Sequence, residues 1–202
     1  MSALPRDFYC RDTRLVARDL LGTKLVRKVG RTRMSGVIIE TEAYFGVDDS
    51  ASHAHRGLTP RNTVMFGPGG FAYVYFVYGM HHMLNVVAET EGCPGAVLLR
   101  ALLPVEGMSR MIARRGSQGK ALTNGPAKLC RALDIDKSFY GWDLVRGRGL
   151  WLEPCETIAA EDICCGPRVG IAYASAVDRQ APLRFWINPE KARSGAVGRV
   201  QS

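Results

Sequence analysis

The sequence predicts an α/β or α+β protein that folds as a single domain around a curved, mostly antiparallel sheet. The chain has 202 residues and 47% hydrophobic content, which is enough for one sizeable core. Short apolar runs between glycine-rich turns predict strands, and fewer segments have the apolar spacing of a helix. We expect one domain over residues 1–202, with a core at 12–188 and flexible ends.

The first predicted elements are a helix and a β-hairpin. Residues 12–21 place apolar side chains at helical spacing, and Gly22 can end that helix in the left-handed conformation. Residues 24–27 and 36–42 then predict two paired strands, the second of which is buried at 37–39.

A long polar segment separates this hairpin from an aromatic strand. Residues 46–70 are rich in Gly, His and Arg and show little periodicity. So long a loop within a compact domain is usually functional or disordered, and its arginines and histidines favour a function. Residues 71–78 follow as an aromatic strand that ends at Gly79.

The second half of the chain continues as short strands and helices. The expected elements are strands at 83–88 and 96–100, helices at 104–115 and 126–133, strands at 149–152, 169–173 and 183–187, and a loosely held tail after Asn188. The helix at 126–133 begins with Pro126, a residue that the first turn of a helix tolerates.

Composition favours a polyanionic partner. There are 27 Lys and Arg residues against 19 Asp and Glu residues, which gives a formal net charge of +8 and a pI near 9.4. Nucleic acid is the commonest partner of such a protein, although the charge could also serve solubility alone.

Neither a membrane nor an oxidising compartment is expected. The six cysteines include no Cys-x-x-Cys pair, which favours free thiols in a reducing cytoplasm. No apolar run reaches the roughly 18 residues of a membrane span, and the first residues lack the apolar core of a signal peptide. We expect a cytoplasmic protein, associated with the nucleoid if the source is a bacterium.

Two acids on the second strand are candidates for chemistry. Side chains alternate along a strand, so Glu40, Glu42 and Tyr44 project to one face. A carboxylate at the end of a buried strand could deprotonate water or stabilise a developing cation. It could equally form a salt bridge with a nearby arginine, and the alternation does not choose between Glu40 and Glu42.

The aromatic strand is a candidate for contact with DNA. In a regular strand Tyr75 and Tyr78 face opposite sides, and Tyr78 adjoins Gly79, where a hairpin tip would push it outward. An exposed tyrosine at such a tip suits insertion between base steps. The alternative is that these aromatic side chains fill the core.

The remaining motifs argue against a metal or a covalent nucleophile. The four histidines at 53, 55, 81 and 82 match no standard zinc spacing, and His53 could instead stack on a flat ligand. Residues 67–70 are followed by no Gly-Lys-Ser/Thr, and no lysine is marked as a Schiff-base nucleophile. We expect no cofactor and no metal.

Several motifs together resemble one known family. They are Glu40–Tyr44, Ser52–Gly57, Thr59–Asn62, Tyr73–Met80, Asn85, Leu98–Leu102, Gly125–Cys130, Arg168–Gly170 and Pro182–Phe185. In this order, and over about residues 12–188, they closely resemble the alkyladenine (3-methyladenine, methylpurine) DNA glycosylases. The resemblance implies an α+β domain like the C-terminal domain of methionyl-tRNA formyltransferase. One departure is His81-His82, which stands where vertebrate relatives have an aromatic pair.

The resemblance also implies an activity. A monofunctional DNA glycosylase of base excision repair flips alkylated or deaminated purines out of duplex DNA and hydrolyses the N-glycosidic bond, leaving an abasic site. The implied substrates are 3-methyladenine, 7-methylguanine, hypoxanthine and ethenoadenine, which the sequence does not rank. The implied partner is double-stranded DNA with a damaged purine, and a monomer suits an enzyme that searches DNA. The competing interpretations are a catalytically silent module for distorted DNA and a tRNA-binding protein.

Nine residues receive roles from the resemblance. They are catalytic Glu42 and Arg100, the substrate-base pocket of Tyr44, His53, Tyr75, Asn85 and Leu98, and the DNA-intercalating Tyr78 and Met80. Glu42 matches the general base that activates water, and only the family motif selects it over Glu40. Asn85 matches the side chain that crowds the exocyclic amine of undamaged guanine, and His53 also presents its backbone N–H to the base.

Overall fold

One antiparallel sheet carries the fold of residues 2–190, which are the residues that the computed structural model describes. Its strands are β1 (Lys24–Val29), β2 (Thr32–Tyr44), β3 (Phe71–Val77), β4 (His81–Ala88), β5 (Gly95–Glu106), β6 (Trp142–Asp143), β7 (Leu150–Glu153), β8 (Ile163–Gly166) and β9 (Arg184–Ile187). Their order is β6-β3-β4-β5-β2-β1-β7, with β9 paired to β2 and β8 to β9. The predicted α+β class and antiparallel sheet are confirmed.

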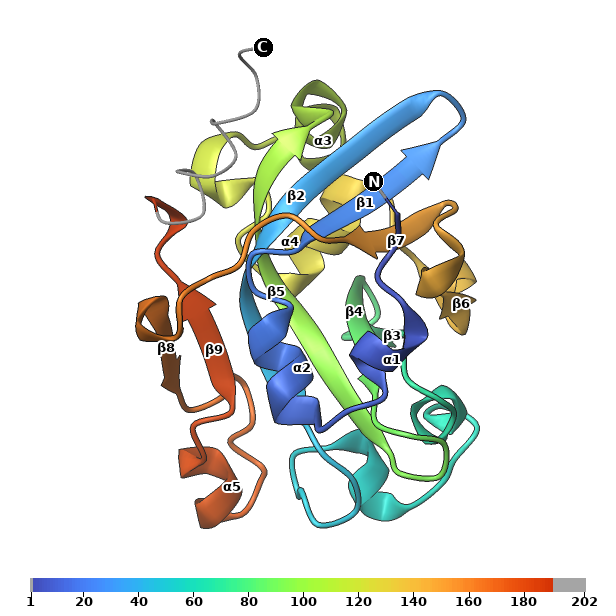
Figure 1. The fold of residues 1–202 in the computed structure, drawn as a ribbon, viewed down its shortest axis with the longest axis vertical. Coiled ribbons are helices and arrows are strands. Elements are labelled where there is room, and N and C mark those ends of the chain that lie inside the picture. Colours follow the sequence, from blue (N-terminus) through green and yellow to red (C-terminus); the bar gives the residue numbers. More distant parts are fainter. Residues whose placement is uncertain (1, 191–202) are drawn as a thin grey trace.

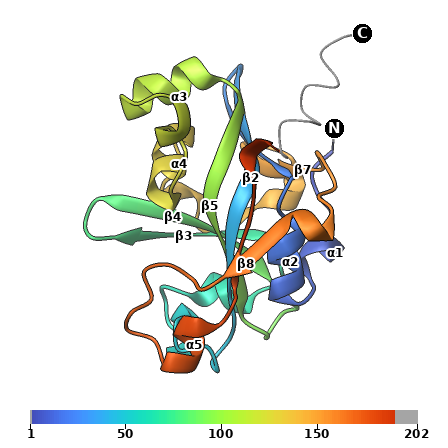
Figure 2. The same ribbon diagram turned by 90° about the vertical axis from the view of Figure 1, so that its left-hand side faces the viewer.

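Short helices surround this sheet. They are α1 (Arg6–Tyr9), α2 (Thr13–Asp19), α3 (Met108–Arg115), α4 (Pro126–Leu133) and α5 (Ala176–Gln180). Figure 2 shows α1 and α2 on one side of β2 and β5, and α3 and α4 on the other. None of the helices within residues 2–190 is both long enough and apolar enough to cross a membrane.

The residues at the two ends of α2, the first predicted helix, determine where it begins and where it stops. The Asp12 side chain accepts the backbone N–H groups of Arg14 and Leu15 at 2.8 and 3.1 Å, which satisfies two donors that the helix leaves free. Gly22 then reverses the chain with φ +82°, a conformation that glycine adopts without strain. The inner face of α2, including Val16 and Ala17, is fully buried.

Two predicted elements differ from the structure. The helix expected at 104–115 begins only at Met108, because β5 continues to Glu106, which pairs with Ser35 of β2. The strand expected at 169–173 is wrong: these residues form turns, and the strand lies earlier, at β8. Ile171 is buried there in a small apolar cluster rather than in a ladder.

The polar segment at 46–70 is an ordered connection. It contains two short 3₁₀ helices, His53–Arg56 and Thr63–Phe66, the first of which is capped by Ser52. The buried Asn62 side chain donates to the carbonyl oxygen of His53 at 2.9 Å and so fixes the first 3₁₀ helix against the second. Of the tail expected after Asn188, residues 191–202 lie outside the described part of the chain.

Strand β2 lies at a fork in the sheet. One of its edges pairs with β5 along most of its length, whereas its other edge pairs first with β1 and then, over Glu40–Glu42, with β9. The register against β5 shifts on both sides of Glu40, where the neighbour on the opposite edge changes. The C-terminal half of β2 is therefore held between two strands in the interior of the molecule (Figure 1).

The β3–β4 hairpin projects from this body. In Figure 2 its two strands run crosswise to β2 and β5 and reach well beyond them, so the sheet is strongly curved. Its turn is made by Tyr78 and Gly79, both with positive φ (+52° and +66°). Only the half of the hairpin near the body is buried, which leaves the tip free to touch another molecule.

Candidate active site

A cavity of about 280 Å³ opens between the hairpin, the segment after β8 and the interior strands β2, β4 and β5. Seven predicted site residues line it, namely Tyr44, His53, Tyr75, Tyr78, Asn85, Leu98 and Arg100. Glu42 lies directly behind the wall, since its hydrogen-bond partners include two of these residues. Met80 does not line the cavity. The structure therefore brings eight of the nine predicted residues to one place.

The carboxylate of Glu42 is completely buried and held from three directions. Its Oε2 accepts the Tyr44 hydroxyl at 2.9 Å and Nη1 of Arg100 at 3.1 Å. Its Oε1 accepts the backbone N–H of Val169 at 2.7 Å. A carboxylate has about four acceptor positions, so Oε1 can accept one further hydrogen bond.

Burial gives this carboxylate unusual acid–base properties. Desolvation raises the pKa of Glu42, and the Arg100 cation, the Val169 N–H and the Tyr44 hydroxyl oppose that rise. A higher pKa makes the ionised form a stronger base, which suits proton transfer near neutral pH. Burial and the adjacent Glu42 also raise the pKa of Tyr44, so that its hydroxyl stays protonated and donates.

Arg100 forms hydrogen bonds with both Glu40 and Glu42, the two acids between which strand alternation could not choose. Its Nε donates to Glu40 at 2.9 Å and its Nη1 to Glu42, so both acids lie on one face, as predicted. Arg184 of β9 lies 3.7 Å from Glu40 as well. The Glu40 side chain is 21% exposed and that of Glu42 is 0% exposed. Glu40 is therefore part of a salt-bridge network, and Glu42 is the acid at the cavity.

Aromatic side chains make one wall of the cavity. The His53 ring stands edge-on to Tyr75, with centroids 4.6 Å apart and planes at 75°. Its Nδ1 lies 2.8 Å from the hydroxyl oxygen of the buried Tyr73. Burial and the nearby Arg61 lower the pKa of His53 to about 4. This wall is neutral at pH 7 and presents aromatic faces, which attract cationic or flat ligands.

Another part of the cavity lining comes from the sheet itself. Asn85 of β4 and Leu98 of β5 are cross-strand neighbours, and Leu98 also lies opposite Glu42 of β2. Both side chains are buried, and the Asn85 amide donates to the carbonyl oxygen of Tyr73 at 3.1 Å. Three adjacent strands therefore fix the positions of these side chains relative to the carboxylate.

The hairpin tip carries two strongly exposed apolar side chains next to the cavity. Tyr78 is 86% exposed and Met80 is 69% exposed, which confirms the predicted outward placement of Tyr78. The expectation that Tyr75 and Tyr78 face opposite sides is wrong, because both line the cavity. The strand ends at Val77, and the left-handed conformation of Tyr78 turns its side chain back toward the Tyr75 side.

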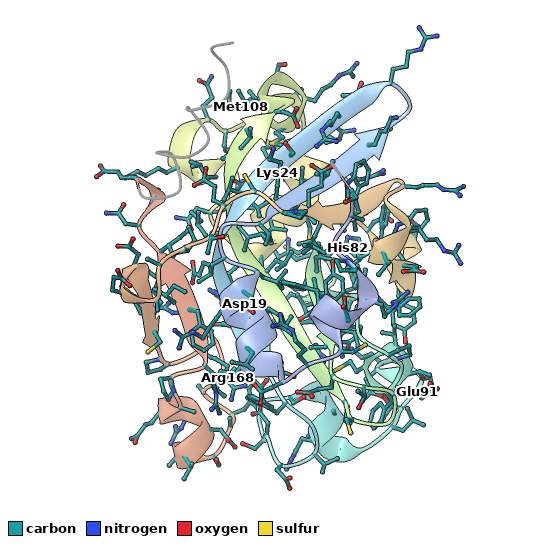
Figure 3. The ribbon with its side chains drawn as sticks, in the orientation of Figure 1. Asp19, Lys24, His82, Glu91, Met108 and Arg168 are labelled. Atoms are coloured by element: carbon teal, nitrogen blue, oxygen red, sulfur yellow. The ribbon has the colours of Figure 1, made fainter. Side chains whose placement is uncertain are left out.

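Sequence reasoning gave no role to a buried ion pair that supports the site. Arg168 donates through both terminal nitrogens to Asp49, and Nη1 also donates to the carbonyl oxygen of Ala43 at 2.9 Å. Its guanidinium carbon lies 4.7 Å from the centre of the Tyr44 ring. Arg168, labelled in Figure 3, directly precedes Val169 in the chain. The Arg168–Asp49 ion pair therefore fixes both the Tyr44 ring and the Val169 N–H that binds Glu42.

No group of His, Cys, Asp and Glu side chains within the described residues could hold a metal ion.

Comparison with known proteins identifies the protein family of this chain. The family model for methylpurine-DNA glycosylase (MPG) matches residues 7–191. The chain belongs to this family.

Two relatives match this chain over nearly their whole length. A protein of Methanocella arvoryzae is 46% identical over 188 residues, which cover 92% of each chain. A protein of Carboxydothermus hydrogenoformans is 46% identical over 189 residues, which cover 93% of this chain and 96% of the relative. Both bear the name "Putative 3-methyladenine DNA glycosylase". Membership places this chain among DNA repair enzymes that hydrolyse N-glycosyl bonds.

Proposed function

We propose that this protein is a monofunctional DNA glycosylase that flips a damaged purine into the cavity and hydrolyses its N-glycosidic bond with water activated by Glu42. The observation that carries the proposal is the buried, ionisable carboxylate of Glu42 behind a cavity walled by aromatic rings. The proposed substrates are 3-methyladenine, 7-methylguanine, hypoxanthine and ethenoadenine, and we expect the enzyme to act as a monomer.

The aromatic walls support selection of damaged bases. Alkylation at N3 or N7 makes a purine cationic, and a tyrosine face attracts such a cation by about 0.5–2 kcal/mol. Tyr44, Tyr75 and His53 line the cavity and supply such faces. The buried Asn85 amide, held by Tyr73, fixes the space at the edge of the base, where the exocyclic amine of guanine would be crowded.

Bond cleavage needs a water molecule and a negative charge. The free acceptor position of Glu42 Oε1 can orient one water and take its proton. Cleavage builds positive charge on the sugar, as in glycoside hydrolysis, and the carboxylate stabilises it. Arg100 opposes the rise that burial causes in the pKa of Glu42, and it fixes the orientation of the carboxylate through Oε2.

The exposed hairpin tip supports base flipping. A base must leave the stack before its sugar carbon can be attacked, which costs a few kcal/mol. Tyr78 can stack in the gap that the base leaves, and Met80 lies beside it at the tip. The net charge of +8 suits the phosphate contacts that hold the distorted backbone.

Base release without strand cleavage follows from the wall residues. Among residues 2–190, no lysine lines the cavity, so no amine is available to attack the sugar. We therefore expect an intact abasic site as the product. Borohydride should trap no covalent complex between the protein and DNA.

The decisive experiment compares two matched variants on β2. We expect Glu42→Gln to lower the single-turnover rate of base release from a duplex with one 7-methylguanine by about 10²–10⁴-fold, the contribution of a general base. Glu40→Gln makes the same change of charge two residues away and should lose far less. Near-normal release by Glu42→Gln would contradict the mechanism, and a larger loss in Glu40→Gln would reverse the assignment. No release of free base by the wild type would leave only a binding protein.

A further inference from the structure

A guanidinium outside the base cavity contacts one of the aromatic rings that line it. The Cζ atom of Arg61 lies 5.3 Å from the centre of the Tyr75 ring, within the roughly 6 Å of a cation–π contact. Tyr75 lines the base cavity, whereas Arg61 lines an adjoining hollow of about 750 Å³ and not the cavity itself. The ring therefore borders the cavity while its cation lies in the hollow next to it.

We propose that Arg61 sets the preference of the enzyme between charged and neutral damaged purines. Its cation weakens the binding of an alkylated, cationic base in the cavity relative to that of a neutral base such as ethenoadenine or hypoxanthine. This inference rests on the proposed function, because it concerns the base that enters the cavity. It adds a repulsive element to aromatic walls that by themselves attract a cationic base.

The charge beside Tyr75 is not balanced by an acid. Within the described part of the chain, Arg61 forms no salt bridge and no carboxylate lines its hollow. Tyr44 also has a guanidinium over its ring, that of Arg168 at 4.7 Å, but both terminal nitrogens of Arg168 donate to Asp49. The cation at Tyr44 is therefore paired with an acid, and the cation at Tyr75 is not.

A positive charge over a ring opposes a second one nearby for two reasons. The Arg61 cation polarises the π electrons of Tyr75, whose negative face is what attracts a cationic ligand. The two cations also repel each other directly, and this repulsion is stronger beside a cavity emptied of water than in bulk water. A neutral purine stacks on the same ring without either cost.

The histidine of the same wall experiences the same cation. His53 lines both the cavity and the hollow, and its ring centroid lies 4.6 Å from that of Tyr75. Burial and the Arg61 cation lower the pKa of His53 to about 4, so a second positive charge is disfavoured at this position. A cationic base against this wall would meet the same repulsion, whereas a neutral base carries no net charge to repel.

The expected effect is modest because Arg61 is exposed and solvent screens its charge. A cation–π contact at an exposed site changes a dissociation constant by about two- to fivefold. Arg61 therefore adjusts the preference and does not exclude cationic bases, which the face of Tyr44 still attracts.

The test compares equilibrium binding to two duplexes that resist cleavage. One carries 7-methylguanine, a cation, and the other carries neutral ethenoadenine, each on a 2′-fluorinated sugar whose electron-withdrawing fluorine opposes the positive charge of cleavage. The ratio of the two dissociation constants is measured, because contacts common to both duplexes cancel in it. We expect Arg61→Gln to shift this ratio about two- to fivefold in favour of 7-methylguanine, and Arg61→Lys, which keeps the charge, to retain the wild-type ratio.

The matched control is Arg56→Gln. Arg56 is an exposed arginine of the same hollow, and it forms no cation–π contact within the described part of the chain. Its loss should weaken both duplexes alike. An unchanged ratio in Arg61→Gln, or an equal shift in Arg56→Gln, would overturn the inference. Because the measurement needs no release of base, its result is independent of the outcome for Glu42→Gln.

Discussion

The floor of the cavity and its rim are built in opposite ways. At the floor, Glu42, Asn85 and Leu98 are at most 5% exposed and come from three adjacent strands. The rim is the hairpin tip, where Tyr78 lines the cavity and Met80 lies beside it, and both are more than two-thirds exposed. The groups that need fixed geometry are therefore set by sheet register, and the groups proposed to meet DNA are left free. Changes at the floor should cost stability, whereas changes at the rim should cost only binding.

The largest expected effect is a loss of stability when the buried Asp49–Arg168 ion pair, which supports the floor, is broken. Asp49→Ala leaves the Arg168 guanidinium buried without its partner, and breaking such a pair costs about 3–5 kcal/mol of unfolding free energy. Asp19→Ala is the control, because it removes an exposed partner of Arg11 and should cost about 0–1 kcal/mol. Urea unfolding measures both. Equal losses would show that the floor gains nothing from burial of the ion pair.

A smaller effect is expected at the rim, in binding rather than in stability. Tyr78→Ala removes the side chain that we propose stacks in the gap, which should weaken binding to a lesion duplex by about 1–3 kcal/mol. The unfolding free energy should change by less than about 0.5 kcal/mol, since the side chain packs on little. Tyr78→Phe keeps the ring and should bind as the wild type does. A stability loss in Tyr78→Ala comparable to that of Asp49→Ala would erase the contrast between floor and rim.

The smallest expected effect is a change in the pH dependence of stability that arises from His53, a residue of the cavity wall. Its pKa is about 4 in the folded protein and near 6.5 when unfolded, so the folded state binds the proton less readily. The stability that His53 contributes is therefore complete above pH 6.5 and is lost as the pH falls from 6.5 toward 4. One proton sets an upper limit of about 1.4 kcal/mol per pH unit. Urea midpoints at pH 7 and pH 5 should separate more in the wild type than in His53→Gln; equal separations would contradict the low pKa.

Local patterns in the sequence predicted the parts of the site that lie on single elements. Strand alternation placed Glu40 and Glu42 on one face, and Gly79 marked the hairpin tip beside Tyr78. Alternation gave the wrong facing for Tyr78, because the strand ends one residue earlier than predicted and Tyr78 has a left-handed φ, which residue alternation does not predict. It also predicted a strand at 169–173 from apolar residues that are turned toward a cavity.

The supports of the site could not be predicted in this way. Asp49 and Arg168 are 119 positions apart, and neither has a neighbour in sequence that indicates burial. The bond from the Val169 N–H to Glu42 spans 127 positions and involves no side chain of Val169. Such contacts depend on tertiary packing, which residue types and spacing do not encode locally. The family motif selected Glu42 over Glu40 without supplying this reason.

The attachment of β9 to β2 over Glu40–Glu42 has a consequence for the order in which the site is made. A chain is synthesised from its N-terminus, and a domain folds as a unit. The wall residues within 169–173 are the last of the cavity's lining to be synthesised. Until the segment from β8 to β9 docks, Glu42 lacks the Val169 N–H and is open to water on that side. The segment that ends in β9 therefore completes the surroundings that distinguish the buried Glu42 carboxylate from an ordinary surface glutamate.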